Sequence, residues 1–320
     1  MLGRVLLAAV ALLSSGAGAR AESIHLSHFG EVMQSIPWAV ALEQKLFQKN
    51  GADVTDVISS QGGGTTIRNM LAGGLGFGAS AGGATVTAIQ SGLPVKIVGV
   101  DNDSLADILW VVPDASPLKT IKDVKGKKFG TTTPGALTYI LGELLLKQNG
   151  LDYKAVTPVP VGTGAGLAAL DSGAVDATYE YEPLFSRDEG KYRVLGRVAD
   201  IMPRVAILLL VATQDMIDKH PDQLRAIMAT HKEAVDFVYA HPKEAADVAS
   251  KRMVGVNQAV VERAVARLVK DRYWSEGGFD PKAMDALQQV LQMTGEVKGA
   301  VDFKAIADQR FLPAGVPRLP

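Results

Sequence analysis

Strand-like and helix-like segments alternate along the first two thirds of this chain. Ser23–His28 has the pattern of a strand, a helix pattern runs from Ser35 to Lys49, and Asp53–Ser59 is again strand-like. The alternation continues to the apolar segment Val205–Ala212, and only helices are evident from Asp215 onward. Repeated strand–helix units predict an α/β fold in which a mostly parallel sheet is flanked by helices.

Two places in this pattern are predicted crossings between lobes. They are residues 112–116 and the stretch around Pro203–Ile207. One lobe then holds residues 22–112 together with 205–320, and the other holds residues 116–203. Two α/β lobes joined by two strands form a hinge with a cleft between them.

Residues 1–21 have the pattern of a secretory signal peptide. Arg4 precedes an apolar run from Val5 to Leu13, and small residues follow up to the A-x-A site Ala19–Ala21. A membrane anchor is the alternative, but a spanning helix needs about 20 apolar residues. We therefore expect residues 1–21 to be removed and the mature protein to be exported.

The absence of cysteine limits both chemistry and location. None of the 320 residues is cysteine, which excludes disulfides, thiol catalysis and Cys-ligated metal centres. It also excludes a lipidated cysteine, so we expect a protein that is free in a periplasm rather than lipid-anchored. The formal net charge of −1 argues against nucleic-acid binding. The 5 histidines lack the spacing of metal ligands, so no metal and no cofactor is expected.

Small and polar residues gather where predicted strands end and helices begin. The loops concerned are Phe29-Gly30, Gly62–Thr66, Ser80–Gly83, Thr131–Gly135 and Gly162–Gly166. In an open parallel sheet this edge binds ligands, because helix N-termini present backbone N–H groups there. The alternative is that these are ordinary turn and cap residues. Neither a G-x-G-x-x-G nor a G-x-x-x-x-G-K-[ST] motif occurs, which argues against nucleotide binding.

Aromatic and acidic residues add candidates for the cleft, each with a structural alternative. Tyr181, Trp38 and Phe29 either contact a ligand or pack in the core. Glu180 would repel an anion and favour a donor-rich ligand if it faces the cleft, and a solvated strand end is the alternative. Glu182 is expected to cap a helix. No catalytic residue is predicted, and the predicted substrate-binding residues are Phe29, Trp38, Gly63, Gly64, Thr65, Ser80, Thr131, Thr132, Thr133, Gly135, Glu180 and Tyr181.

Several ordered segments resemble a known family. The most specific, Ser116–Gly130 (SPLKTIKDVKGKKFG), is similar to the family segment SPIKSVADLKGKKI. Gln90–Val95 resembles the pattern G.PV..V, and Ala168–Pro183 (AALDSGAVDATYEYEP) resembles AL..G.VDA followed by W.P. From about Ile24 to Pro242 the chain thus resembles the periplasmic substrate-binding proteins of ABC transporters. The group concerned is the one for aliphatic sulfonates, taurine, nitrate and thiamine pyrimidine precursors.

The resemblance implies a fold and a role. The fold is the type II periplasmic-binding-protein fold, with two lobes and a two-strand hinge. The role is capture of a small solute between the closing lobes and its delivery to the permease subunits of an ABC importer. We expect a monomer that is not an enzyme. The family's pyrimidine synthase and desulfinase depend on cysteine-containing sites, which this chain lacks.

The solute itself is less constrained by the resemblance. Helix ends and threonines favour a small organic anion, such as a sulfonate, taurine, a nitrate-like ion or a carboxylate. A nitrogen heterocycle, such as a thiamine pyrimidine precursor, is the alternative. Two departures from the family pattern bear on this choice: Gly76 stands where the family has an acidic residue, and Tyr181-Glu182-Pro183 stands where it has WDP.

Overall fold

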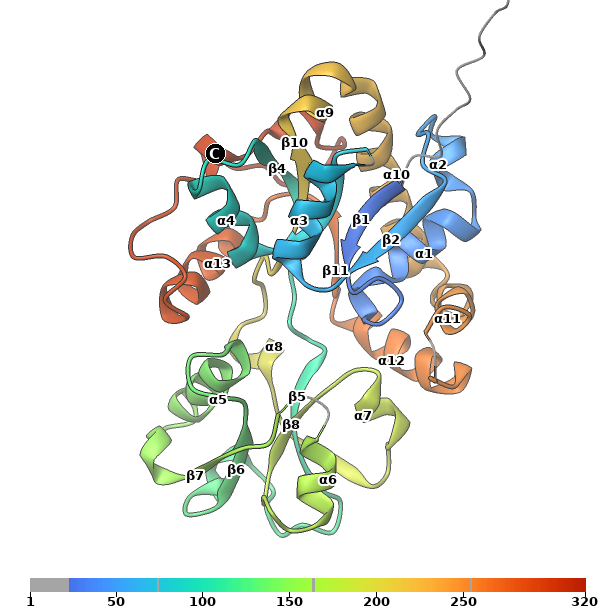
Figure 1. The fold of residues 1–320 in the computed structure, drawn as a ribbon. Coiled ribbons are helices and arrows are strands. Elements are labelled where there is room, and N and C mark those ends of the chain that lie inside the picture. Colours follow the sequence, from blue (N-terminus) through green and yellow to red (C-terminus); the bar gives the residue numbers. More distant parts are fainter. Residues whose placement is uncertain (1–22, 74, 163–164, 254) are drawn as a thin grey trace, which may run out of the picture.

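The computed structural model describes residues 23–73, 75–162, 165–253 and 255–320, and the predicted signal peptide lies outside them. The chain forms two lobes joined by two extended crossing segments (Figure 1). Among the helices of the described residues, none combines the length and the apolar character that a membrane span requires.

The first lobe is built on a six-stranded sheet with the order β11-β4-β10-β3-β1-β2. Its strands β1, β2 and β3 are parallel, whereas β10 runs antiparallel to both β3 and β4. Four strands therefore point the same way, and β10 and β11 point against them. The strands are β1 (Ser23–Ser27), β2 (Asp56–Ser60), β3 (Phe77–Ala81), β4 (Val95–Asn102), β10 (Leu208–Thr213) and β11 (Trp274–Gly277).

Helices cover both faces of this sheet (Figure 1). They come from the beginning of the chain and from its last third, which returns to the first lobe after β10. The helices are η1 (Met33–Ser35), α1 (Ile36–Glu43), α2 (Leu46–Lys49), α3 (Gly63–Ala72), α4 (Gly82–Gln90), α9 (Gln214–Lys219), α10 (Pro221–Ala240), α11 (Pro242–Ser250), α12 (Gln258–Lys270), α13 (Pro281–Met293), α14 (Phe303–Ile306) and η4 (Gln309–Phe311).

The second lobe repeats this arrangement on a smaller scale. Strands β8, β5 and β9 form an antiparallel sheet, and β6 and β7 form a parallel pair. A parallel bridge between Phe129 and Ala177 links the two, so that all strands except β5 run the same way. The elements are β5 (Ile108–Pro113), η2 (Ile121–Val124), β6 (Lys128–Thr131), α5 (Leu137–Gln148), η3 (Tyr153–Ala155), β7 (Thr157–Pro160), α6 (Gly166–Asp171), β8 (Thr178–Tyr181), α7 (Leu184–Arg187), β9 (Tyr192–Arg197) and α8 (Val198–Ile201).

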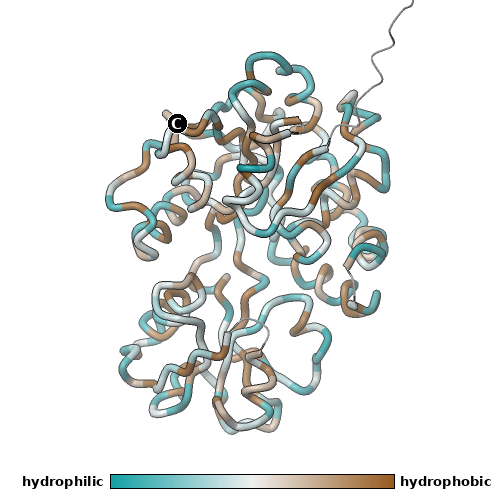
Figure 2. The backbone as a smooth tube through the Cα atoms, viewed as in Figure 1, coloured by the Kyte–Doolittle hydropathy of each residue, from teal (hydrophilic) through white to brown (hydrophobic). Residues whose placement is uncertain are grey.

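Apolar side chains are concentrated on the central strands. Strand β10 is almost wholly buried because it is hydrogen-bonded on both edges and covered on both faces, which accounts for its unbroken apolar run. Figure 2 shows hydrophobic residues along the inner strands and hydrophilic ones on the outer turns. The α/β fold with flanking helices, predicted from the alternation of strands and helices, is confirmed. Most strands of each lobe run the same way, but β5, β10 and β11 run against them, so both lobes are mixed rather than mostly parallel in their strand pairing.

The structure corrects three details of the sequence-based prediction. Ile108–Pro113 pairs with β8 and β9, so the first crossing comes before this strand and not at residues 112–116. A strand that is apolar on both faces fits either lobe, and its sequence does not indicate which one. The last third also contains a strand, β11, which is too short and too polar to predict. Finally, the sequence pattern predicts a helix from Gly135 to Gln148, whereas α5 begins at Leu137, because the φ of Gly135 is +85° and lies outside the helical region.

Candidate ligand-binding cleft

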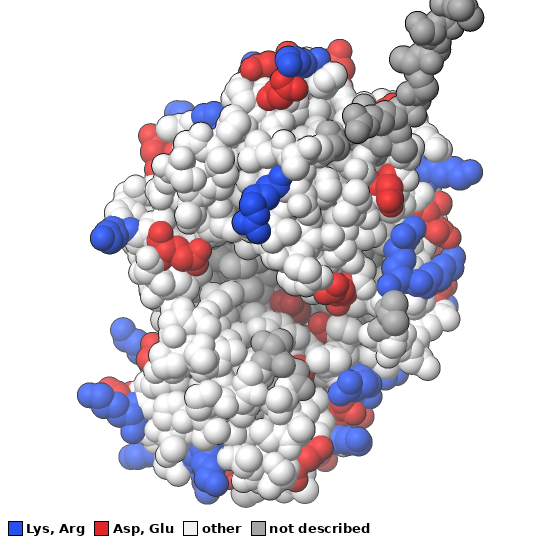
Figure 3. Space-filling model, viewed as in Figure 1, with Lys and Arg blue, Asp and Glu red and all other residues white. Residues whose placement is uncertain are grey.

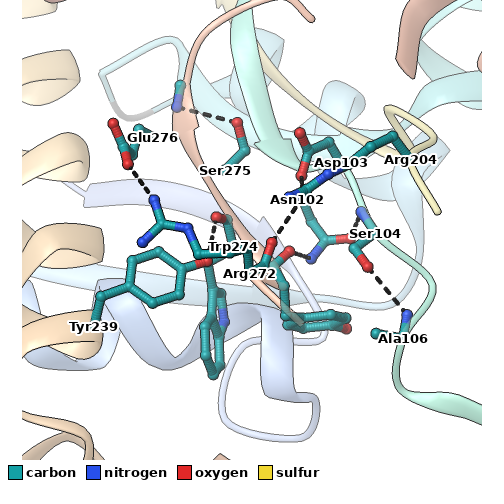
Figure 4. Close-up of polar contacts among 12 residues, drawn as sticks. Asn102, Asp103, Ser104, Ala106, Arg204, Tyr239, Arg272, Trp274, Ser275 and Glu276 are labelled. Atoms are coloured by element: carbon teal, nitrogen blue, oxygen red, sulfur yellow. Dashed lines mark hydrogen bonds and ion pairs between the residues drawn. The ribbon is translucent and has the colours of Figure 1, made fainter. Parts of the chain in front are cut away.

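The two crossing segments are tied to each other by a polar cluster (Figure 4). Arg204, on the second crossing, lies 2.9 Å from Asp103 on the first, measured from Nη1 to Oδ1. The same Nη1 donates a hydrogen bond of 2.7 Å to the carbonyl of Arg272, whose guanidinium stacks 3.8 Å above the ring of Tyr239. Burial raises the pKa of Asp103, and the charge of Arg204 partly offsets this. The hinge therefore contains a half-buried ion pair that joins both of its strands.

Helix α12 of the first lobe makes a further contact with the second lobe. Arg267 Nε lies 2.8 Å from Glu182 Oε1, and its guanidinium lies 4.9 Å from the centre of the Phe185 ring. Arg263 donates a hydrogen bond of 2.8 Å from Nη2 to the carbonyl of Ser186. These contacts hold α7 against α12, so side chains as well as the hinge set the angle between the lobes.

A cavity of about 360 Å³ lies between the lobes, beside these contacts. Its size is within the range of small-molecule sites, ~300–1,000 Å³. Both lobes and the first crossing contribute to its wall. The lining residues are Glu31, Val32, Gln34, Asp107, Tyr181, Glu182, Pro183, Leu184 and Val256.

The cavity is acidic. Glu31, Asp107 and Glu182 line it, and none of the described residues in its wall is Lys or Arg. Figure 3 shows acidic side chains in the hollow between the lobes, while the basic side chains in this view lie on the outer surface of the lobes. Asp107 and Glu182 are only 6% and 4% exposed, so water screens their charges poorly.

Burial governs the ionisation of these carboxyl groups. It raises the pKa of Asp107 to about 7, against a smaller opposing effect of the Tyr273 phenol beside it. Burial also raises the pKa of Glu182, while Ser186 and Arg267 act in the opposite direction. Glu182 accepts a hydrogen bond of 3.2 Å from the backbone N–H of Ser186. It therefore caps α7, as predicted, and lines the cavity as well.

Tyr181 is the one predicted binding residue among the described residues of the cavity wall. Its ring meets Tyr179 edge to face, with centroids 5.7 Å apart. Its hydroxyl interacts with Thr138, whose own hydroxyl lies 2.6 Å from that of Thr132. Thr132 is thereby connected to the cavity through one intervening side chain.

A second group of predicted residues gathers at the start of α3, away from the cavity wall. Ser80, at the end of β3, is buried and donates a hydrogen bond of 3.2 Å to the carbonyl of Gly63. A Cβ at Gly63 would lie 2.8 Å from Ser80 Oγ, so glycine allows the helix to approach the strand. Gly64 is exposed, and half-buried Thr65 accepts a hydrogen bond of 2.9 Å from Arg68. Ser80, Gly63, Gly64 and Thr65 therefore lie at the sheet edge where strands end and helices begin, which is where the sequence predicts these residues.

Trp38 is not a wall of the cleft. It is fully buried in the first lobe, where its Nε1 donates a hydrogen bond of 2.7 Å to Asp101. Its ring packs on Phe47, Phe77 and His231, with centroids 6.3, 5.9 and 4.8 Å away. The core alternative therefore holds for Trp38.

The remaining predicted residues also lie outside the cavity wall. Phe29 packs against the core, with the guanidinium of Arg252 5.8 Å from its ring centre. Glu180 is buried, lies opposite Leu109 in the sheet, and accepts a hydrogen bond of 2.9 Å from the Tyr181 N–H. Thr131 is buried, whereas Thr133 and Gly135 are exposed.

Sequence reasoning missed Asp107 and Gln34, which lie in the cavity wall. A signal was present for Asp107, since it is the only charged residue in the apolar stretch 105–112. Gln34 carries no such signal. Within the described part of the chain, no group of three or more His, Asp or Glu side chains is arranged to hold a metal ion.

Comparison with known proteins identifies relatives of this chain. A binding protein of Brucella abortus (strain 2308), provisionally named, is 25% identical over 219 residues, which span 67% of this chain and 66% of the relative. A provisionally named aliphatic sulfonates-binding protein of Bacillus subtilis (strain 168) is 26% identical over 276 residues, or 82% and 81% of the two chains. The chain thus spans just under two thirds of the Brucella protein.

Solved structures share the fold. The periplasmic aliphatic sulphonate binding protein SsuA of Escherichia coli superimposes with a TM-score of 0.71 at 19% identity, covering 89% of this chain and 97% of SsuA. The desulfurization enzyme DSZB superimposes with a TM-score of 0.66 at 15% identity, covering 91% and 97%. One fold therefore serves both a binding protein and an enzyme.

A family model settles the affiliation that the sequence motifs suggest. The model described as "NMT1/THI5 like" matches residues 32–245, which is more than half of the chain. The matched region runs from the loop after β1, through the second lobe, to the beginning of α11. On this match and on its fold, the chain belongs to the NMT1/THI5-like family.

Proposed function

We propose that this protein is the solute-binding component of an ABC importer and is not an enzyme. It captures a small organic solute between its lobes and delivers it to the transmembrane permease. The observation that carries this proposal is the cavity of about 360 Å³ whose wall is built from both lobes and from a crossing segment. A site divided in this way is completed only when the lobes are close together, which couples binding to closure.

The location and partners follow from the same role. The predicted signal peptide, residues 1–21, supports export to a periplasm, and the absence of cysteine supports a chain without a lipid anchor. The lobe boundary that we propose lies in residues 103–107 and 202–207, between the strands of the two sheets. We expect a monomer that meets its permease subunits with both lobes.

Two classes of solute are candidates. A small organic anion is supported by the SsuA fold, by the relative named for sulfonates, and by the start of α3 at Gly63-Gly64-Thr65. The start of α4 offers an anion less support than the start of α3, because the carboxylate of Glu296 lies against it. A Cβ at Gly83 would lie 1.5 Å from Oε2 of Glu296. A nitrogen-bearing, donor-rich solute is favoured instead by the acidic wall of the cavity.

Native mass spectrometry of the protein purified from its own periplasm tests the proposal. We expect one co-purified small molecule per chain, and calorimetry with that molecule should give 1:1 binding and a raised melting temperature. Incubation should return the solute chemically unchanged. Conversion of the solute would instead show an enzyme, as the fold shared with DSZB allows.

A further inference from the structure

The cavity between the lobes contains buried hydrogen-bond acceptors that no donor satisfies. Oδ1 of Asp107 and Oε1 of Gln34 are both buried, and neither accepts a hydrogen bond of good geometry from the described part of the chain. The Tyr273 phenol lies beside the Asp107 carboxylate and interacts with it, but its hydroxyl is not aligned for such a bond with Oδ1. Both residues line the cavity. Buried acceptors without a donor are uncommon in folded proteins, because the lost hydration is not replaced. The missing partner is therefore expected to be a donor that enters the cavity.

Asp107 is held in this position by a backbone hydrogen bond and by its burial. Its backbone carbonyl accepts a hydrogen bond of 2.9 Å from the N–H of Glu182, which links the first crossing to the end of β8. Its side chain is 6% exposed, and the buried phenol of Tyr273 lies beside it. A buried carboxylate at the junction of the lobes therefore acts on whatever occupies the cavity.

The charges around the cavity favour a cation. Glu31 and Glu182 face the same space as Asp107. Arg267 reaches Glu182 from α12, and His28 Nδ1 lies 3.2 Å from Glu31. Neither of these basic groups belongs to the cavity wall as described, and Asp107 has no cationic partner there. An anion in the cavity would lie beside an unpaired buried carboxylate, which is unfavourable in a poorly hydrated space.

The rest of the wall is apolar. Val32, Leu184 and Val256 contribute aliphatic surface, and Tyr181 contributes an aromatic ring. Apolar walls with a few directed polar groups are typical of sites for organic ligands rather than for free ions. An aromatic ring also favours a neighbouring cation.

We propose that this cavity binds an organic monocation, in which a protonated amine or amidinium donates to Asp107 and Gln34 while its apolar body packs on Tyr181, Leu184 and Val256. This assignment rests on the proposed solute-binding function and names the class of solute. Glu182, paired with Arg267, completes the acidic side of the site.

The ionisation of Asp107 gives this site a dependence on pH. Burial raises the pKa of Asp107 to about 7, so a large part of the free protein carries a neutral carboxyl group below that pH. A bound cation favours the charged carboxylate, and affinity therefore rises as the pH increases through about 7. The other titratable groups that face Asp107 are Glu31, Glu182, Tyr181 and Tyr273.

Calorimetry with one set of similar probes tests the assignment. Benzamidinium, benzylammonium, benzyl alcohol and benzenesulfonate are titrated at pH 8 into protein freed of co-purified solute. We expect the two cations to bind at least tenfold more tightly than benzenesulfonate and the neutral alcohol to lie between them. Affinity for benzamidinium, which stays charged throughout, should fall about tenfold or more at pH 5.5.

Two variants localise the effect. Asp107→Asn should weaken benzamidinium binding at least tenfold and abolish its dependence on pH, and Gln34→Leu should weaken it severalfold. Asp101→Asn is the matched control, because Asp101 is also a buried carboxylate but lies in the core beside Trp38, outside the cavity wall. Thermal melts show that each variant is folded before its affinity is measured.

The outcomes separate this inference from the proposed function. Tighter binding of benzenesulfonate, or a normal affinity for benzamidinium in Asp107→Asn, overturns the cation site but leaves solute capture intact. Failure of every probe and of every co-purified solute to bind overturns both.

Discussion

Glu182 of the second lobe and Arg267 of α12 lie 2.8 Å apart across the boundary between the lobes, from carboxylate Oε1 to guanidinium Nε. The Glu182 side chain is fully buried, whereas that of Arg267 is 31% exposed. The same carboxylate also caps α7 and lines the cavity. A substitution in this ion pair should therefore affect both the stability of the protein and the cavity between the lobes.

Removing the arginine should destabilise the fold. Arg267→Ala leaves the buried Glu182 carboxylate without its cation, and we expect a loss of about 2 kcal/mol in the free energy of unfolding. This is less than the ~3–5 kcal/mol of a fully buried pair, because Arg267 is partly exposed. Thermal denaturation at pH 7 should show a melting temperature several degrees lower. Lys219→Ala is the control, since its ion pair with Asp215 is exposed on both sides and should contribute little. Equal effects of the two substitutions would contradict the prediction.

Asp107→Asn should change how stability depends on pH. The pKa of Asp107 is raised to about 7 in the folded protein from an ordinary value of 3.8. The folded state therefore holds this proton more strongly, and the resulting stabilisation is full below about pH 4 and is lost as the pH rises through about 7. The difference corresponds to about 4 kcal/mol at most. In melts of ligand-free protein from pH 4.5 to 8.5, the wild-type melting temperature should fall relative to that of Asp107→Asn. Parallel curves would argue against a raised pKa.

The hinge ion pair should influence closure. Arg204→Ala removes the contact of 2.9 Å with Asp103, which links the two crossing segments through their side chains. We expect the ligand-free protein to open further, with a larger radius of gyration in small-angle scattering and an affinity for its solute about two- to tenfold lower. The conservative variant Arg204→Lys should recover part of both changes. An unchanged radius together with unchanged affinity would show that the backbone alone sets the hinge.

Trp38 should matter for stability but not for binding. Trp38→Phe removes the hydrogen bond to Asp101 and part of the packing against Phe77 and His231, at a cost of about 1–3 kcal/mol. Denaturant unfolding measures this cost, and calorimetry with the co-purified solute should give an affinity within twofold of wild type. A tenfold loss of affinity would instead indicate that Trp38 contributes to the binding site.

Thr132 is expected to act on binding through its neighbours. Thr132→Ala removes the hydroxyl that lies 2.6 Å from that of Thr138, which in turn contacts Tyr181 of the cavity wall. We expect affinity to fall about two- to fivefold while the melting temperature changes by no more than about 2 °C. Thr157→Ala, at an exposed position of β7, should change neither quantity. A large loss of stability with normal affinity would show that Thr132 has only a local structural role.

Much of the architecture follows from local patterns. The alternation of strands and helices predicts the α/β lobes, and the unbroken apolar run at residues 205–212 predicts a strand covered on both faces. The segment Ser116–Gly130 indicates the family that the match over residues 32–245 establishes. These features depend on residues that are close together in the chain, so they can be predicted from short segments of the sequence.

The cavity depends instead on residues that are distant in the chain. Gln34, Asp107, Glu182 and Val256 meet only because the crossing segments and the C-terminal helices bring both lobes together. The spacing of residues along the chain does not specify this meeting.

The sequence by itself determined the class of fold, the family and the sheet edge where polar loops collect. Only the tertiary structure decided that Trp38 is in the core, that the helix-capping Glu182 also faces the cavity, and that Asp107 is buried there with Oδ1 lacking a hydrogen bond of good geometry. The periodicity of a sequence indicates which side chains share a face of the same helix or strand. The charge and hydration of a binding site are set by which other elements pack against that face, and that is a property of the whole fold.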